Sequence, residues 1–255
     1  MNAIPLQRHD DDDVYYPESD GQPMAETDLH LDEMVDLIHA LRRRYRHVPD
    51  VYVTGNLFFY YAKGDPRSVV APDVFLVQGV PKGRRRVYKL WEEGKVPALV
   101  IEVTSDSTRS EDVSDKKRTY ERLGVEEYFL HDPLGDYLNP RLQGHRLSGA
   151  RYKAMRPMAD GSLQSLSTGL TLRVEGPKLR LIDTASGEPL PWVEELDARA
   201  LEAQERAEIE AAARQVAEAA RQAADAARQA AEERTRVLER ELARLRRELE
   251  GRKGG

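Results

Sequence analysis

Two carboxylates, Asp73 and Glu102, are the side chains of this sequence best placed to do chemistry. Asp73 opens a short apolar run, and Glu102 interrupts another at 98–103. Burying an ionised carboxylate without a partner is costly, so each needs a cation, a hydrogen-bond donor or a solvent-facing strand end. If the two runs are neighbouring strands, the carboxylates can meet at one edge, and two hard oxygen ligands completed by water and phosphate are how Mg²⁺ is usually held. The alternative is two unrelated polar strand ends, one of them paired with a lysine, and the two carboxylates alone favour that alternative.

A lysine on a predicted helix adds to the pair. Asp112, Lys116 and Tyr120 are spaced four residues apart and therefore share one helix face. A lysine beside a metal-bound phosphate can orient or deprotonate the attacking water, or stabilise developing charge. The alternative is an ordinary ion pair between Asp112 and Lys116, worth roughly a few tenths of a kcal/mol, which spacing alone does not exclude. Lys117 competes for any lysine role, although it projects about 100° round the helix.

The first helix and the strands that would position these side chains lie before residue 131. Thr27 or Asp28 can cap a helix that runs to about Tyr45. Its apolar positions recur at helical spacing: Leu31, Met34, Val35, Ile38 and Leu41. Runs rich in β-branched and aromatic residues predict strands at 50–54, 56–61, 69–77, 98–103 and 128–130.

A second helix and several hairpins are expected further along the chain. Ser107 or Thr108 can cap a helix that ends at Leu123, because Gly124 is well placed to stop it. Short apolar runs between 142 and 182 alternate with Gly/Pro turns, and we expect them to form hairpins that extend the sheet.

The C-terminal quarter predicts one long helix. Residues 192–250 contain no glycine or proline and are dominated by Ala, Glu, Arg and Gln, which are good helix formers. A coiled-coil seam with 4-3-4 spacing and an earlier seam of small residues mark the helix: Leu238, Leu242, Leu245 and Leu249, then Ala220, Ala223, Ala227 and Ala230. A second copy of the chain is the simplest partner. The alternative is a solvated helix held by its many charge pairs.

Composition sets the class of protein and the remaining boundaries. The chain has no cysteine, which excludes disulfides and thiolate metal sites and suits a cytoplasmic location. We expect no membrane-spanning segment. A net charge of -6 speaks against a general nucleic-acid coat protein but permits an enzyme with a local basic strip. We expect an acidic flexible leader at 1–22, one domain at 23–191 and the long helix at 192–255.

Several short motifs in fixed order resemble the Uma-two (Uma2) family of the PD-(D/E)XK restriction-endonuclease-like superfamily. The resemblance covers roughly residues 22–174. It is carried by Pro72-Asp73, Glu102-Val103-Thr104-Ser105, Ser107-Thr108, Asp112, Lys116, Tyr120, Gly124-Val125, Glu127-Tyr128 and Asp132-Pro133.

The resemblance implies an α/β fold, a restriction-endonuclease-like mixed β-sheet flanked by helices, and a set of site residues. Asp73 and Glu102 would be metal ligands for Mg²⁺ or Mn²⁺, with the carbonyl of Val103 as a further ligand, and Lys116 would be the catalytic lysine. The parent motif places its lysine two residues after the second acid, where this chain has Thr104. Lys116 would replace it only if the following helix folds back beside the strand.

Other residues are given supporting roles or none. Glu26, near the first helix, lies where some superfamily members bring another acid, and Asp112 and Tyr120 would support the site. His30 stands where the family often has a histidine and is assigned no chemical role. A basic cluster at 82–89 could meet a phosphate backbone or could be a solvated loop.

These features predict a metal-dependent endonuclease that hydrolyses phosphodiester bonds in DNA. The rival hypothesis is a catalytically idle nuclease-like module that dimerises or recruits a partner through its C-terminal helix. The intact acid pair favours the enzyme, whereas the missing strand lysine and the acidic net charge favour the module.

Overall fold

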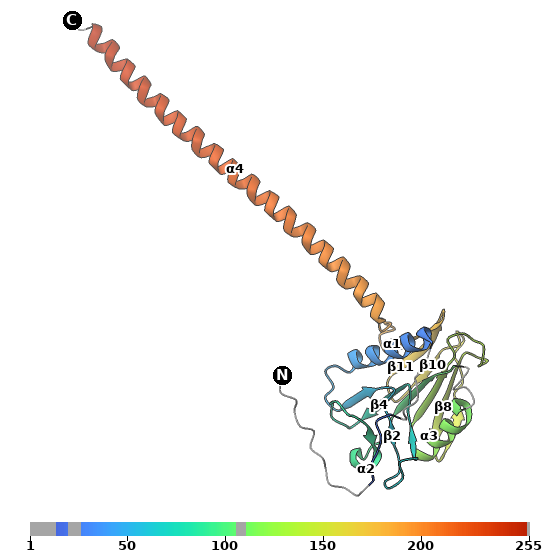
Figure 1. The fold of residues 1–255 in the computed structure, drawn as a ribbon. Helices are drawn as coiled ribbons and strands as arrows, with labels where there is room; N and C mark the ends of the chain where they lie inside the picture. The colour runs from blue at the N-terminus through green and yellow to red at the C-terminus, as the bar shows by residue number, and fades with distance from the viewer. Residues whose placement is uncertain (1–13, 20–26, 106–110, 254–255) are drawn as a thin grey trace. The chain divides into compact units, whose positions relative to one another are not determined.

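The computed structural model describes residues 14–19, 27–105 and 111–253 of the chain. The chain divides into two compact units, Met1–Val193 and Glu194–Gly255 (Figure 1). Within the described ranges, no helix combines the length and the apolar character needed to cross a membrane.

A six-stranded mixed sheet forms the middle of the first unit (Figure 1), in the order β1-β4-β6-β7-β8-β9. Its strands are β1 (Val51–Thr54), β4 (Val74–Gln78), β6 (Leu99–Val103), β7 (Glu127–His131), β8 (Leu142–Ser148) and β9 (Arg151–Ala154). β6 and β7 run parallel, and the other neighbouring pairs of this sheet are antiparallel. All five residues of β6 are buried, as its nearly continuous apolar run predicts for a central strand.

Both faces of the sheet are covered, so the first unit has three layers. One face packs on α1 (Asp28–Arg44) and on a three-stranded sheet of β10 (Leu163–Ser165), β11 (Leu170–Glu175) and β12 (Lys178–Asp183). The other face packs on α3 (Lys117–Leu123) and on a small sheet of β2 (Phe59–Tyr60), β3 (Val69–Val70) and β5 (Tyr88–Lys89), which leads into α2 (Leu90–Glu93). Side chains of a strand alternate between its faces, so Glu102 shares the α3 side with Val100.

The late hairpins differ from the sequence prediction in one respect. β8 and β9 extend the central sheet, as expected. β10, β11 and β12 instead form a separate antiparallel sheet that supplies five leucines to the core under α1: Leu163, Leu170, Leu172, Leu179 and Leu181. They pack over the sheet rather than beside it because these leucines cover the apolar face that α1 leaves open.

The buried face of α1 was predicted only in part. Thr27 caps the helix, and its side chain accepts a hydrogen bond from the backbone N–H of His30. Leu31 and Val35 are exposed, whereas the buried face combines apolar with polar residues: Met34, Leu37, Ala40 and Leu41, then His30, Glu33 and Asp36. The apolar spacing predicted the wrong buried face because buried polar residues of α1 bind partners on distant elements, as Glu33 and Asp36 do on β12.

The second helix begins with wider turns than the four-residue spacing assumes. Glu111–Lys116 forms a π-helix, η1, and α3 follows directly and ends at Gly124, which adopts a left-handed conformation (φ 86°). The proposed caps Ser107 and Thr108 lie outside the described residues. Short π-helical segments occur often at functional sites, and this one carries Asp112 and Lys116.

The second unit is one helix, α4 (Val193–Lys253), of 61 residues. The expected element at 192–255 therefore corresponds to a single continuous helix over nearly its whole length. Ion pairs between residues four apart line its surface, such as Arg214–Glu210 and Arg228–Glu232. The predicted fold class, a mixed sheet with flanking helices, added hairpins and a long C-terminal helix, is confirmed.

Candidate active site

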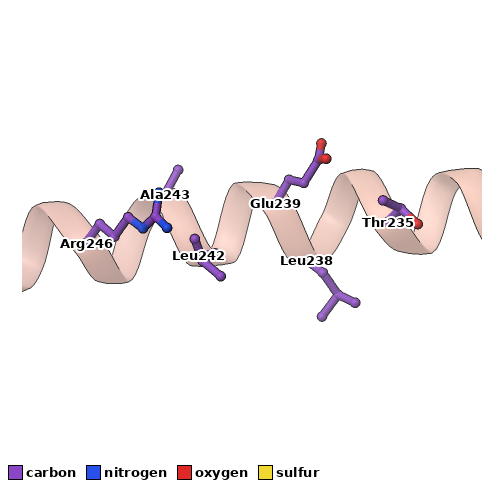
Figure 2. Close-up of a pocket in the computed structure, with 6 residues that line it drawn as sticks. All are labelled: Thr235, Leu238, Glu239, Leu242, Ala243 and Arg246. Carbon is purple, nitrogen blue, oxygen red and sulfur yellow. The ribbon is translucent and has the colours of Figure 1, made fainter.

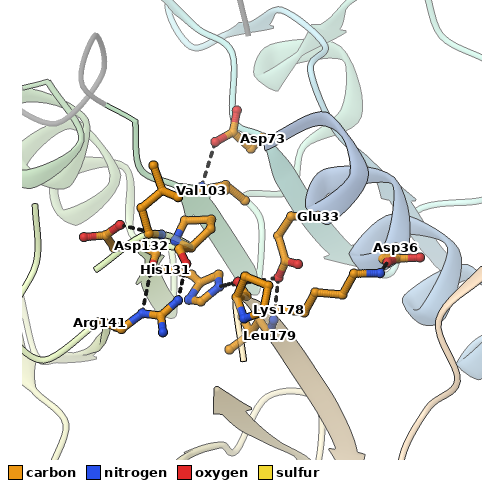
Figure 3. Close-up of polar contacts among 12 residues, drawn as sticks. Glu33, Asp36, Asp73, Val103, His131, Asp132, Arg141, Lys178 and Leu179 are labelled. Carbon is orange, nitrogen blue, oxygen red and sulfur yellow. Dashed lines mark hydrogen bonds and ion pairs between the residues drawn. The ribbon is translucent and has the colours of Figure 1, made fainter. Parts of the chain in front are cut away.

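Asp73 and Glu102 meet where the neighbouring inner strands β4 and β6 reach one end of the central sheet. β4 and β6 pair antiparallel with Val74 opposite Ile101, so Asp73, just before β4, faces the end of β6. The backbone N–H of Asp73 donates to Glu102 Oε2 at 3.2 Å. The N–H of Val103 donates to Asp73 Oδ2 at 2.8 Å (Figure 3). The Glu102 carboxylate thus binds the backbone of Asp73, and the Asp73 carboxylate binds the backbone of Val103 next to Glu102, which holds the two acids together.

Lys116 lies beside the acid pair, because η1 folds back over the end of β6. Its Nζ is 3.1 Å from Glu102 Oε2 and 2.9 Å from Asp112 Oδ1. Lys116, Glu102 and Asp112 are buried, whereas Asp73 and Lys117 are half-buried. The geometry therefore distinguishes the two lysines and brings Lys116 to the acids.

Tyr120 and Thr104 occupy the remaining positions around Glu102. The Tyr120 hydroxyl donates to Glu102 Oε1 at 2.7 Å and is fully buried. Thr104, where the parent motif has its lysine, is buried, and its Oγ1 has no hydrogen-bond partner among the described residues. The positive charge next to Glu102 thus comes from the helix rather than from the strand.

Burial and the neighbouring charges together shift the pKa values of Glu102, Asp73 and Lys116. Burial and the negative charges of Asp73 and Asp112 raise the pKa of Glu102 well above its usual value, although Lys116 opposes them. Burial also opposes ionisation of Asp73, but His30, Lys116 and the Val103 N–H together hold the pKa of Asp73 below its usual value. Burial works against charge on Lys116 too, yet Glu102 and Asp112 raise its pKa, so Lys116 remains a cation and is no general base.

His30 belongs to the site, although sequence reasoning assigned it no role. Its Nε2 is 3.4 Å from Asp73 Oδ1, and its side chain is 4% exposed. His30 and Asp73 line a pocket of about 130 Å³ together with Asn56 and Asp28. The signal that could have found His30 was a polar residue on the apolar side of α1, next to Met34 at helical spacing.

Gly55 fixes the backbone of Asp73 by close approach. A Cβ at position 55 would lie 1.8 Å from the Asp73 carbonyl oxygen, so no larger residue fits. The next residue, Asn56, takes a positive φ of 48° and donates its N–H to the Pro72 carbonyl at 2.8 Å. The loop between β1 and β2 therefore presses on the segment that presents Asp73.

A divalent cation fits the donor set at Asp73 and Glu102. Asp73, Glu102 and Asp112 surround one lysine, so the cluster carries more negative than positive formal charge. Burial first, and then the negative charges of Asp73 and Asp112, raise the pKa of Glu102. Across the described residues, no group of three or more His, Asp or Glu side chains has the geometry of a complete metal site. Two carboxylates completed by water and substrate phosphate are the arrangement that Mg²⁺ usually takes.

Two expected contributions to the site are not found among the described contacts. Glu26 lies outside the described residues. The basic cluster at 82–89 is largely paired within the chain: Arg85 binds Glu93, Arg86 binds Glu18, and Lys89 binds Glu92. Lys82 donates to the carbonyls of Tyr45 and Arg46 at the end of α1. The Arg86 side chain is 61% exposed in its ion pair, so contact of this cluster with a phosphate backbone stays a prediction.

A second buried polar cluster lies under the site, between α1, β7 and β12 (Figure 3). Glu33 Oε1 accepts the N–H of Leu179 at 2.7 Å and is 3.7 Å from His131 Nε2. Burial raises the pKa of Glu33 to about 8 and lowers that of His131 to about 4, so both are mostly neutral at pH 7. Asp36 accepts bonds from Lys178 and from the N–H of Val193.

Asp132 and Glu127, which carry part of the family resemblance, have structural partners. Asp132 accepts four backbone N–H bonds from the loop that follows it, between 134 and 138. Glu127 binds Arg146, Ser165 and Ser167, which ties β7 to the β10 sheet.

Comparison with known proteins gives a family and several solved structures. The model of a family, Uma2, with the description "Putative restriction endonuclease", matches residues 3–177. A crystal structure described as "a putative nuclease belonging to DUF820 from Anabaena variabilis ATCC 29413" is similar with a TM-score of 0.43 and 13% identity, over 61% of this chain and 86% of that chain. No curated protein matches the chain.

Proposed function

We infer the function of this protein from its family and its site. The chain belongs to the Uma2 family, which is described as "Putative restriction endonuclease". We propose that its first unit is a metal-dependent endonuclease that hydrolyses phosphodiester bonds in DNA. The observation that carries the proposal is the constellation of Asp73, Glu102 and Lys116 at one sheet edge.

We assign each residue a proposed role, which its position in the cluster supports. Asp73, Glu102 and the carbonyl of Val103 would hold Mg²⁺ or Mn²⁺, which supplies Lewis-acid stabilisation of phosphate oxygens and a more acidic bound water. Lys116 would stay protonated and stabilise charge that develops on the phosphate. Tyr120 holds Glu102 in place, Asp112 holds Lys116, and His30 positions Asp73.

The experiment is a cleavage assay on DNA and RNA, with Mg²⁺, Mn²⁺ or a chelator. Wild type is expected to cut DNA only with a divalent cation, and Glu102→Gln is expected to lose this cleavage while its far-UV circular dichroism stays unchanged. Lys116→Gln is expected to behave like Glu102→Gln, and Lys117→Gln like wild type. Metal-independent cleavage, or full activity of Glu102→Gln, would overturn the assignment.

A second candidate function is a nuclease-like module without activity. The observation that favours it is that both Glu102 oxygens already accept hydrogen bonds, from Lys116, from Tyr120 and from the N–H of Asp73. Titration calorimetry separates the two candidates, because an idle module has no reason to bind Mn²⁺ in a way that depends on Asp73 and Glu102.

We also propose that the protein works in the cytoplasm as a homodimer joined through α4. The absence of cysteine agrees with a reducing compartment. Large apolar side chains on α4 are exposed in the single chain, and a second copy would cover them. Light scattering of the full chain should give twice the mass of one chain.

A further inference from the structure

The C-terminal part of α4 presents an exposed apolar seam. Leu238, Leu242 and Leu245 are 57%, 51% and 54% exposed. Leu249 continues their 4-3-4 spacing in the sequence. In a heptad, this spacing assigns Leu238 and Leu245 to position d and Leu242 to position a, and the preceding a position is Thr235.

Six side chains line an open depression on this seam, and all of them belong to α4 (Figure 2). Its lining includes Thr235, Leu238, Glu239 and Leu242, which are positions a, d, e and the next a. Four residues in this arrangement form the hole that receives a d-position side chain in a parallel coiled coil. The occupant that fits is therefore a leucine from another helix with the same heptad.

Charges on both sides of the seam indicate which helix that is. In a parallel, in-register pair, position g of one helix lies near position e of the next heptad on its partner. Arg234 (g) would face Glu239 (e), and Glu241 (g) would face Arg246 (e). Both contacts join opposite charges, and each occurs twice by symmetry. The seam is thus complementary to a second copy of itself.

An earlier apolar stripe on α4 decides the orientation. Its members are separated by three or four residues in turn: Val216, Ala220, Ala223, Ala227 and Ala230. Ala230 and Leu238, each at position d of its own repeat, are eight residues apart instead of seven, so the stripe shifts round the helix by one residue between them. In a parallel, in-register pair, both helices shift at the same level, so both parts of the stripe remain covered.

The antiparallel alternative fits this pattern poorly. An antiparallel pair centred on Ala223 would place Leu238 and Leu242 against Glu208 and Gln204. It would also set the one-residue shift of one helix against a regular segment of the other. Of these two arrangements, the parallel one matches leucine with leucine and alanine with alanine along the helix.

We propose that α4 pairs with α4 of a second copy as a parallel, in-register coiled coil whose strongest segment is 234–246. This inference rests on the proposed self-association and adds its direction and register. It makes no use of the acid site, so loss of nuclease activity leaves it untouched.

Cysteine cross-linking tests direction and register directly, because the chain contains no cysteine of its own. Thr235→Cys in the full chain is expected to form a disulfide-linked dimer under mild oxidation, since two a positions face each other within disulfide reach. Arg240→Cys, at an exposed f position five residues later, is the matched control and should cross-link at least about tenfold more slowly, because f positions point away from the partner. Equal rates for the two variants would overturn the proposal.

A mixture of two variants tests the antiparallel alternative. An antiparallel pair centred on Ala223 brings Thr235 of one chain within one helical turn of Ala213 of the other, and Ala213 continues the earlier stripe three residues before Val216. Mixed Thr235→Cys and Ala213→Cys chains are therefore expected to give only the linkage of Thr235→Cys with itself and of Ala213→Cys with itself. A linkage found mainly between the two different variants would overturn the parallel direction.

A charge swap tests the pairing between the flanks. Glu241→Arg is expected to raise the dimer dissociation constant about tenfold, because each of two symmetric contacts becomes repulsive. Adding Arg246→Glu to the same chain should restore the dissociation constant of wild type. If the double variant dissociates as readily as the single one, the parallel register is wrong, whereas a monomeric wild type would refute self-association itself.

Discussion

Lys116 lies between two fully buried carboxylates, so replacing it should lower the free energy of unfolding as well as the rate of cleavage. Lys116→Met removes the cation and leaves Glu102 and Asp112 facing each other without compensation. Breaking a buried ion pair in this way costs about 3–5 kcal/mol. Urea denaturation at pH 7 should show that loss, while Lys117→Met, at the half-buried neighbour, should change the free energy of unfolding by less than about 0.5 kcal/mol.

Gly55 provides a second test at the scale of one residue. Gly55→Ala places a methyl group against the Asp73 carbonyl, so the loop or the Asp73 segment must shift. We expect a loss of about 1–3 kcal/mol in unfolding free energy together with weaker Mn²⁺ binding by calorimetry. Gly83→Ala is the control, because its methyl would meet nothing closer than 3.9 Å. Unchanged Mn²⁺ affinity in Gly55→Ala would show that the close approach does not position Asp73.

At the scale of elements, α1 carries a pH-dependent contribution to stability. The pKa of Glu33 is about 8 in the fold against 4.5 as its ordinary value, so between these values the fold holds a proton that the unfolded chain releases. Stability from Glu33 is therefore fully present at low pH and is lost as pH rises toward 8. His131, at about 4 against 6.5, acts oppositely, but only below pH 6.5.

The test compares variants between pH 6.5 and 8, where His131 no longer contributes. In wild type, the retained proton of Glu33 should lower the free energy of unfolding by about 2 kcal/mol as pH rises over this range. The slope is roughly 1.4 kcal/mol per pH unit. Glu102, whose pKa is also raised, changes stability in the same direction, so the prediction concerns the difference between variants. Glu33→Gln, which is neutral throughout, should show a fall smaller than that of wild type by this amount.

The matched control for Glu33 lies on the same helix. Asp32 is exposed, so Asp32→Asn should keep the full pH dependence of wild type. Denaturation curves of the three proteins at the two pH values decide. An identical slope in Glu33→Gln and wild type would contradict the retention of a proton on buried Glu33.

The elements also show how far sequence reasoning could reach. β6 and the capped start of α1 were predictable, because a nearly continuous apolar run and a capping threonine are local signals. The buried side of α1 was not, because Glu33 and Asp36 accept hydrogen bonds from Leu179 and Lys178, which are 146 and 142 residues away. Nothing within the helix itself indicates those partners.

The residues of the candidate site also divide into those that the sequence indicates and those that only the structure brings together. Asp73 and Glu102 could be named from motif order, and Lys116 from helical spacing. His30 could not be assigned a role, since its partner Asp73 is contributed by a loop rather than by its own helix. The π-helical turn at η1 was also missed, because four-residue spacing is compatible with both an α-helix and a wider turn over so short a segment.

At the scale of the whole molecule, the two units should be separable. A chain that ends at Glu195 keeps the N–H of Val193, which binds Asp36, and loses almost all of α4. We expect it to bind Mn²⁺ as the full chain does and to scatter light as a monomer. A dimer of the shortened chain would assign self-association to the first unit instead of α4.

The contacts of α1 also bear on how the first unit folds. This helix is synthesised before its partners, and its buried acids bind residues 142, 146 and 157 positions later in the chain. Closing such long loops is slow, and the nascent chain must be extended to Val193 before the closure can occur. The buried contacts of Glu33 and Asp36 under the site would therefore be completed only after the first unit has been synthesised to its end.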